Sequence, residues 1–419
     1  MNYFADNLFS VDILREQLII TGLLPNKNIE MSVSSKQSRL YYLDNLRCYA
    51  MLMGVFLHIA IAYGDNIGKV WYVQDSQSTK AMEVGIWFIH LFRMALFFFI
   101  SGYFSNLVIQ KKGIKHFIKA RYLKLFLPFF LFMPLLVLAM NGVVLFASNY
   151  LESEQKMLHM FIATLQKTNY ELSHFRTFHL WFLYYLILFS LLAVLVQRLH
   201  GTYLMRKITN LFSSSFSPLI ILVAIIPSHY FGTFPFSAPE SLIPEVGVFG
   251  YYGVFYLYGW FFFNNESSID LIKRYTKVTL LLILISYAVL YHYLPSFSAK
   301  DPIVYSTELK LFLAVLESFC AVSLVLLAVI GAKTYLVNEN YLANYFSKAS
   351  YVVYLVHLPV VIFVQVLMAD FDINVWLKFM IATVFSLGLS VLCYEFFKYK
   401  SKLVSFFKPE LSKIVPLLK

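Results

Sequence analysis

Apolar residues run along this chain in repeated stretches of about 20 residues, each long enough to cross a bilayer as a helix. Polar and basic segments separate these stretches. A backbone inside lipid must satisfy its own hydrogen bonds, so such stretches are helical. The pattern predicts an all-α polytopic membrane protein with about ten transmembrane helices, at residues 43–63, 84–108, 125–147, 180–196, 218–235, 246–263, 278–293, 309–330, 350–368 and 375–394.

The composition supports this class. Apolar residues make up 59% of the 419 positions, and charged residues only 14%. The net charge of +11 does not indicate a nucleic-acid partner, because the basic residues are spread over alternate loops rather than gathered in one patch. The expected partner surface is the lipid bilayer. The three cysteines form neither a disulfide framework nor a metal-binding spacing, and no metal site is expected.

The distribution of Lys and Arg predicts the orientation. Of the 34 basic residues, 24 fall in the two terminal segments and the alternate loops between them, and six fall in the other loops. The positive-inside rule then places both termini in the cytoplasm. We expect a cytoplasmic or interfacial segment at 1–42, a transmembrane domain at 43–396 and a basic cytoplasmic tail at 397–419. The abundance of Phe, Tyr, Lys and Asn is typical of AT-rich bacterial genomes, so the expected location is a bacterial inner membrane.

The first span, residues 43–63, carries two candidate functional residues. Arg47 and His58 are 11 residues apart, so a helix places them on nearly the same face and roughly 16 Å apart along its axis. A neutral buried imidazole can accept a proton from a hydroxyl, and a guanidinium suits a phosphate or carboxylate. Two other interpretations stay open: a hydrogen-bonded structural histidine, and an arginine that reaches to the membrane interface.

Further polar residues lie in or near other spans. Arg93 and Glu317 fall in the middle of apolar stretches, where ionisable groups are costly, and could form a pair. His179 and Trp181 begin the fourth span at its outer end, where Trp181 could belong to an aromatic belt and His179 could meet a substrate. His357 lies within the ninth span. All five are candidate substrate-binding residues.

Two stretches allow alternative interpretations. The basic segment Lys111–Pro128 either anchors the protein to anionic lipid or binds the phosphates of a charged donor, with Lys115 as one contact. The small pair Ser101–Gly102, among aromatic residues of the second span, either allows close helix packing or leaves a gap for a thin ligand.

Four segments together resemble the acyltransferase 3 family of membrane O-acyltransferases. They are LDNLRCYAMLMGVFLH, which holds Arg47 and His58 at the family's spacing, FFFISGYF at 97–104, the basic loop that leads to Pro128, and SYVVYLVH at 350–357. The resemblance covers residues 41–400.

The resemblance implies transfer of an acyl group from cytoplasmic acyl-CoA, either acetyl-CoA or succinyl-CoA, to a hydroxyl of an extracytoplasmic polysaccharide or glycolipid. It implies no permanently bound cofactor. Arg47 and His58 correspond to the family's essential pair, and Arg121 and Lys124 to its paired arginines. Lys124 replaces an arginine, which removes bidentate anion binding at that position.

Two other classes of function compete with this one. A multi-pass transporter would move a polar or anionic solute past Arg93, Glu317 and His58, and would need no acyl-CoA. The chain shows no clear inverted repeat of the kind that many transporters contain. A membrane sensor or scaffold would use the polar residues for packing alone.

Overall fold

A computed structural model describes residues 41–151, 155–165, 176–199, 201–212, 214–236, 238–239, 241–263, 266–295 and 305–414. These ranges are helical apart from turns, loops and one isolated bridge between Arg176 and Ser241. The main helices are α3 (Tyr41–Ile61), α4 (Lys80–Arg121), α5 (Leu127–Tyr150), α6 (Lys156–Leu165), α7 (Trp181–Leu199), α8 (Tyr203–Phe212), α9 (Ser217–Phe231), α10 (Val246–Phe262), α11 (Asp270–Arg274), α12 (Thr276–His292), α13 (Thr307–Tyr335), α14 (Tyr341–Met368) and α15 (Val375–Ile414).

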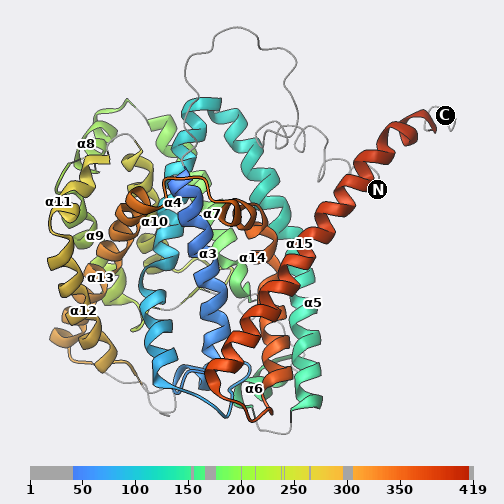
Figure 1. Cartoon of the computed structure of the whole chain (residues 1–419). Coiled ribbons are helices and arrows are strands. Elements are labelled where there is room, and N and C mark those ends of the chain that lie inside the picture. Colours follow the sequence, from blue (N-terminus) through green and yellow to red (C-terminus); the bar gives the residue numbers. More distant parts are fainter. Residues whose placement is uncertain are drawn as a thin grey trace.

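Within these ranges, five helical stretches are long and apolar enough to cross a membrane, or six if the bent pair α8–α9 counts as one span. One of the five, Lys80–Tyr150, contains both α4 and α5, which run in opposite directions between the two ends of the bundle (Figure 1). The protein is therefore a multi-pass helical membrane protein. The number of ten spans and the cytoplasmic termini stay predictions.

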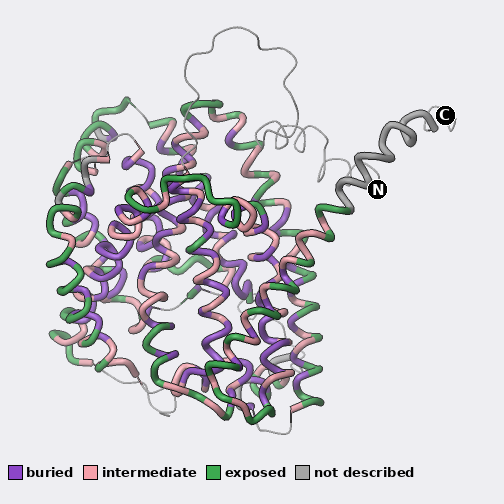
Figure 2. Tube along the Cα trace, viewed as in Figure 1, coloured by how far each residue is buried: buried purple, intermediate pink, exposed green. Residues whose placement is uncertain are grey.

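The outer surface of the bundle is apolar. The helices at its sides carry their exposed positions outward, while buried positions gather in the middle (Figure 2). Many of these exposed side chains are large and hydrophobic, including Leu138 on α5, Leu284 on α12 and Val384 on α15. A water-soluble monomer rarely exposes large continuous apolar patches, whereas lipid tails favour them.

Several helices extend beyond their predicted spans, and for two of them, α4 and α14, the reasons are local. The second span was expected to end at 108, but α4 continues to Arg121, with a break at Gly113, whose φ of 80° suits glycine. The ninth was expected to begin at 350, but α14 begins at Tyr341, after Asn340 caps it by accepting a hydrogen bond from Ala343. Both extensions are polar helical turns that the apolar pattern alone does not mark. The expected segment 1–42 lies outside the described residues except for Tyr41 and Tyr42, which begin α3.

Helices α4 and α10 pack with their backbones in contact. A Cβ atom on Gly102 would collide with the carbonyl group of Tyr256, and one on Gly259 would collide with that of Phe99. Small residues permit such close approaches between membrane helices. This contact confirms the close-packing interpretation of Ser101–Gly102, and the alternative of a gap for a thin ligand is wrong at this position.

Helix α14 lies at the centre of the part of the fold that holds the candidate site. It packs against α3, α5 and α15, and α3 in turn packs against α4. The polar positions on one side of α14 therefore face several elements at once.

Candidate active site

Arg47 and His58 lie on one uninterrupted helix, α3, as the spacing predicts. Regular helix geometry separates them by roughly 16 Å along the axis. His58 is in the last turn and stays partly exposed, whereas its neighbours Leu57 and Ile59 are buried. Its Nδ1 atom is buried without a hydrogen-bond partner. The site therefore presents an imidazole with an unused polar atom inside the bundle.

Three histidines gather around this position. The ring centroid of His357 on α14 lies 5.3 Å from that of His58 and 4.8 Å from that of His179. The Nδ1 atom of His357 contacts the carbonyl oxygen of Tyr354 at 2.8 Å, one turn earlier in the same helix. Because a carbonyl oxygen can only accept, Nδ1 is the donor in this bond, which fixes the orientation of the ring. The structure thus brings together three of the histidines that the sequence singled out.

Arg93 on α4 belongs to the same cluster. A Cβ atom on Gly54 would collide with its Nη1 atom, so the guanidinium lies against α3 one turn before His58. Its charge acts on the imidazoles of His58, His90 and His357. The Nε atom of Arg93 is buried and has no hydrogen-bond partner. The Arg93 guanidinium therefore lies beside the candidate base His58, and its Nε–H group is available to bind a ligand.

The proposed pairing of Arg93 with Glu317 is wrong. Among the described residues, Glu317 accepts a hydrogen bond from the backbone N–H of Phe236 at 3.2 Å and lies 4.0 Å from Nε2 of His229. His229 also contacts the hydroxyl of Ser318 at 2.8 Å. Glu317 is only 3% exposed, and its carboxylate is occupied by the contacts with Phe236 and His229. Its role in binding substrate stays a prediction, and no carboxylate of the described residues pairs with Arg93.

At the other end of α3, Arg47 contacts α14. Its guanidinium donates to the hydroxyl of Ser347 at 3.0 Å and lies 3.9 Å from the carboxylate of Asp44. One turn further along α14, the hydroxyl of Tyr351 donates to the carbonyl oxygen of Lys124 at 2.7 Å. Helix α14 therefore joins Arg47 to the basic segment that was predicted to bind the donor. The Arg47 side chain stays 40% exposed, which leaves it open to a ligand.

The basic segment ends in a π-helical turn, Tyr122–Phe126, between α4 and α5. Such turns often occur at functional sites. Arg121 precedes this turn and donates to the hydroxyl oxygen of Ser105 at 2.8 Å, an atom that also accepts from Tyr256 at 2.7 Å. Arg121 is thus fixed between α4 and α10. The side chains of Lys115 and Lys124 are exposed, as a phosphate-binding surface requires.

Trp181 and His179 are both buried rather than outward-facing, at 6% and 8% exposure. Trp181 packs among aromatic rings that include Phe98 and Tyr252, so the interpretation as an aromatic-belt residue is wrong. The carbonyl oxygen of His179 accepts a hydrogen bond from Tyr354 at 2.7 Å, and both of its ring nitrogens are buried, with no close hydrogen-bond partner within the described part of the chain. Contact of either residue with a substrate stays a prediction.

The sequence reasoning missed two residues next to His58. Trp71 lies in the segment between α3 and α4, and its ring stacks on that of His58 with centroids 5.7 Å apart. Gln365 on α14 bonds to the indole and to the α3 backbone. A glutamine within an apolar span was a usable signal, because buried amides need partners. Trp71 carried no such signal, since its segment has no periodicity.

The fold is that of a polytopic membrane protein whose described helices gather three imidazoles and a guanidinium in its interior. The chain matches the acyltransferase 3 family, described as an acyltransferase domain, over residues 40–395, and it belongs to that family. The resemblance seen in the four motifs is thereby confirmed. Membership implies acyltransferase activity.

Among curated proteins, the chain is 25% identical over 376 residues to glucans biosynthesis protein C of Escherichia coli O157:H7 and of Escherichia coli strain K12. The alignments cover 85% of this chain and 91% of each relative. No solved structure matches the chain. The likeness to these relatives therefore extends over nearly the whole length of both proteins.

Proposed function

We propose that this protein transfers an acetyl or succinyl group from cytoplasmic acyl-CoA to a hydroxyl of an extracytoplasmic glycan, in a bacterial inner membrane. The observation that supports this most strongly is the arrangement along α3. Arg47 lies at one end, and His58 with the Arg93 guanidinium beside it lies near the other. The two ends are separated by a distance comparable with an extended pantetheine arm.

In this proposal the donor enters at the Arg47 end. The exposed Lys115 and Lys124 side chains, together with Arg47, bind the phosphates of coenzyme A. Arg121 is held by Ser105 and shapes the turn that carries Lys124. The thioester carbonyl then lies near His58.

At the His58 end, the imidazole takes the proton of the acceptor hydroxyl while the hydroxyl oxygen attacks the thioester carbonyl carbon. The C–S bond breaks, and the thiolate of coenzyme A receives the proton from the imidazolium. The products are the glycan ester and free coenzyme A, so His58 returns to its neutral form. The guanidinium of Arg93 stabilises negative charge on the acyl group during this step.

The acceptor is proposed to be a glucan or a related envelope glycan. The support is the 25% identity, over 85% of this chain, to proteins named for glucan biosynthesis. The candidate contacts for the acceptor are His179 and His357, which lie next to each other and to His58 in the cluster.

The test uses His58→Ala in purified protein reconstituted in nanodiscs. Transfer of a radiolabelled acyl group from acyl-CoA to a glucan oligosaccharide should fall by at least about 10²-fold, the usual contribution of a general base. His159→Ala is the matched control, since His159 is exposed on α6 and should not affect transfer. Mass spectrometry of envelope glycans from cells with and without the gene identifies the acyl group. Equal transfer by the His58→Ala protein would refute the proposal.

A further inference from the structure

The segment between α3 and α4, residues 62–79, closes on itself directly after the end of α3 at Ile61. The backbone N–H of Asp75 donates to the carbonyl oxygen of Ala62, and that of Thr79 donates to the carbonyl oxygen of Tyr63, both at 2.9 Å. A short 3-10 helix, Ile67–Val70, lies within it. The segment is therefore an ordered loop that begins next to the last turn of α3, where His58 lies.

Trp71 in this segment contacts His58 directly. The two rings are stacked, with an angle of 18° between their planes. The indole N–H of Trp71 donates to the side-chain oxygen of Gln365 at 2.9 Å. The side-chain N–H₂ of Gln365 donates to the backbone carbonyls of His58 and Ile59, each at 3.0 Å. The buried Gln365 side chain thus links the Trp71 ring to the backbone of His58.

These bonds satisfy carbonyl groups that helix ends leave without partners. The last four carbonyls of a helix lack intrahelical donors, and α3 ends at Ile61. Gln365 is only 2% exposed, so its amide has no water to replace these partners. The network therefore fixes both the final turn of α3 and the orientation of the Trp71 ring over His58.

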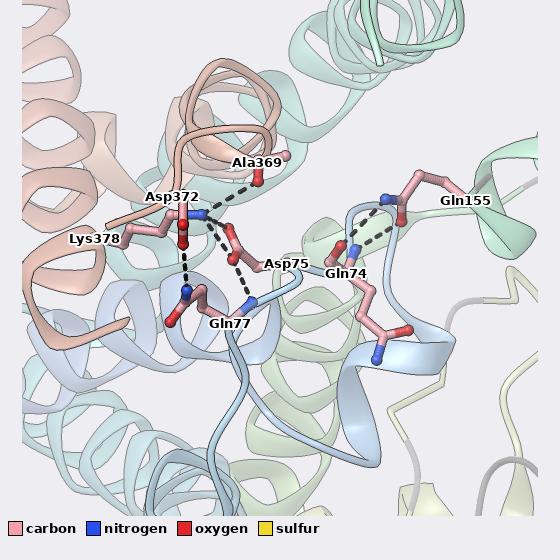
Figure 3. Close-up of polar contacts among 7 residues, drawn as sticks. All are labelled: Gln74, Asp75, Gln77, Gln155, Ala369, Asp372 and Lys378. Atoms are coloured by element: carbon pink, nitrogen blue, oxygen red, sulfur yellow. Dashed lines mark hydrogen bonds and ion pairs between the residues drawn. The ribbon is translucent and has the colours of Figure 1, made fainter. Parts of the chain in front are cut away.

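A buried ion pair anchors segment 62–79 on its far side. Nζ of Lys378 on α15 donates to both carboxylate oxygens of Asp75 at 2.8 Å and to the carbonyl oxygen of Ala369 at 3.2 Å (Figure 3). Lys378 is fully buried and Asp75 is 4% exposed. Burial raises the pKa of the Asp75 carboxyl, and the bonds from Lys378 and Gln77 oppose that shift.

Two further contacts hold the same segment. The backbone N–H of Gln74 donates to the side chain of Gln155 at 2.8 Å, and Gln155 donates back to the carbonyl oxygen of Gln74 at 3.2 Å. The side chain of Gln77 donates to Asp372 at 2.7 Å. Figure 3 shows these bonds on either side of Asp75. The segment is thus tied to α15, to the turn before it and to the start of α6.

From these contacts we propose that Trp71 and Gln365 are positioning residues for His58, and that the Asp75–Lys378 pair holds this cover, the Trp71 ring, in place. The inference deepens the proposed function, since it assumes that His58 is the base. Trp71 restricts the imidazole to one orientation and covers one face of the ring.

Carbethoxylation of histidines by diethyl pyrocarbonate tests the cover without relying on catalysis. Mass spectrometry of protein in nanodiscs gives the rate at His58 relative to that at the exposed His159. Trp71→Ala should raise the relative rate at His58 several-fold, and Trp71→Phe should leave it near the wild-type value because a ring remains. Trp376→Phe is the control, since Trp376 is 51% exposed on α15. An unchanged rate in Trp71→Ala would refute the cover.

Kinetics test the positioning role. Trp71→Phe and Gln365→Met remove the indole–amide bond and should lower kcat for acyl transfer at least tenfold, within the about 10²-fold that a misplacement of about 1 Å can cost. The KM for acyl-CoA should stay unchanged, because the donor phosphates bind at the opposite end of α3. Gln110→Met on the exposed face of α4 is the control. A wild-type kcat in both variants would refute positioning even if the cover exists.

The anchor is tested by a double replacement, Asp75→Leu with Lys378→Met. Replacing a buried ion pair by apolar residues of similar size usually preserves the fold, whereas removing one partner does not. The double variant should elute as a single species and show faster carbethoxylation at His58. The same treatment of the exposed pair, Glu395→Gln with Lys398→Met, should have no effect. A wild-type rate in the anchor variant would refute the anchor.

The two proposals fail in distinguishable ways. If the wild-type protein transfers no acyl group while His58 is shielded by Trp71, the proposed function is wrong and the cover is real. If transfer requires His58 but the carbethoxylation rate at His58 is the same with and without the Trp71 ring, His58 is the base and the positioning role of Trp71 is wrong.

Discussion

The guanidinium of Arg93 on α4 lies directly against Gly54 on α3, one helical turn before His58. Only a glycine leaves room for it there. Among the residues that the structure describes, the buried Nε atom of Arg93 has no hydrogen-bond partner, and Glu317 contacts the Phe236 backbone and His229 instead. An arginine without a carboxylate partner inside a membrane protein is costly unless a ligand completes it. The absence of a side chain at Gly54 is therefore a condition for placing positive charge beside the candidate base.

The first prediction concerns Gly54→Ala. The new Cβ atom would displace Nη1 of Arg93, while helix propensity would favour alanine by about 1 kcal/mol. We expect a folded protein whose kcat for acyl transfer falls at least tenfold, within the about 10²-fold cost of a small misplacement. Gly85→Ala on α4 is the control, because a Cβ atom there meets nothing within 4 Å. A wild-type kcat in Gly54→Ala would show that Arg93 does not act in the reaction.

The second prediction concerns the choice of acyl group. If the Arg93 guanidinium binds the free carboxylate of a succinyl group, Arg93→Met should reduce transfer from succinyl-CoA at least tenfold more than transfer from acetyl-CoA. A hydrogen bond to a charged group contributes about 1.5–3 kcal/mol, which is enough to produce a tenfold difference between the two donors. Competition between the two labelled donors on one sample measures it directly. Equal losses would instead assign Arg93 to the charge that develops on the thioester oxygen.

The third prediction concerns the opposite end of α3. Arg47→Ala should raise the KM for acyl-CoA at least tenfold, because it removes a charge-assisted contact to phosphate. Lys124→Arg should lower the KM, since a guanidinium binds phosphate with two parallel bonds and an ammonium does not. Lys207→Ala on α8 is the control for a basic residue outside the site. Measuring KM for acyl-CoA at several salt concentrations checks the assignment. A KM in Arg47→Ala that equals the wild-type value would contradict it.

The features that depend on helix geometry could be predicted from the sequence. The apolar run fixes α3, and an 11-residue spacing fixes the relation between Arg47 and His58 whatever the rest of the fold does. The close contact at Gly102 was among the alternatives, because small residues mark tight packing. The family motifs located Arg47 and His58 by a separate route, and the match over residues 40–395 agrees.

The contacts between distant segments could not be predicted in this way. The sequence places Arg93 and Glu317 in the middle of apolar stretches, but that position alone does not say which helices adjoin. In the structure α13 presents Glu317 to the Phe236 backbone. Trp71 lies in a segment without periodicity, so nothing in the sequence places its ring on His58. Trp181 was expected near lipid because it begins a span, yet the adjoining rings bury it.

The last prediction tests the packing that holds α4 against α10. Gly259→Ala would force a Cβ atom into the carbonyl of Phe99, and neither backbone can move without disturbing the other helix. Overpacking of this kind costs about 1–3 kcal/mol or more. We expect a lower Tm in detergent, measured by loss of the monodisperse peak on heating, with a wild-type KM for acyl-CoA in the protein that stays folded.

Gly331→Ala on α13 is the matched control, because a Cβ atom there meets nothing within 4 Å, and it should not lower the Tm. The two interpretations of this region then separate by measurement. Close packing predicts a loss of stability without a change in donor binding, whereas a ligand passage at Gly102 and Gly259 predicts a higher KM at unchanged Tm. The latter result would contradict the backbone contact and would reopen this part of the bundle as a route for the donor.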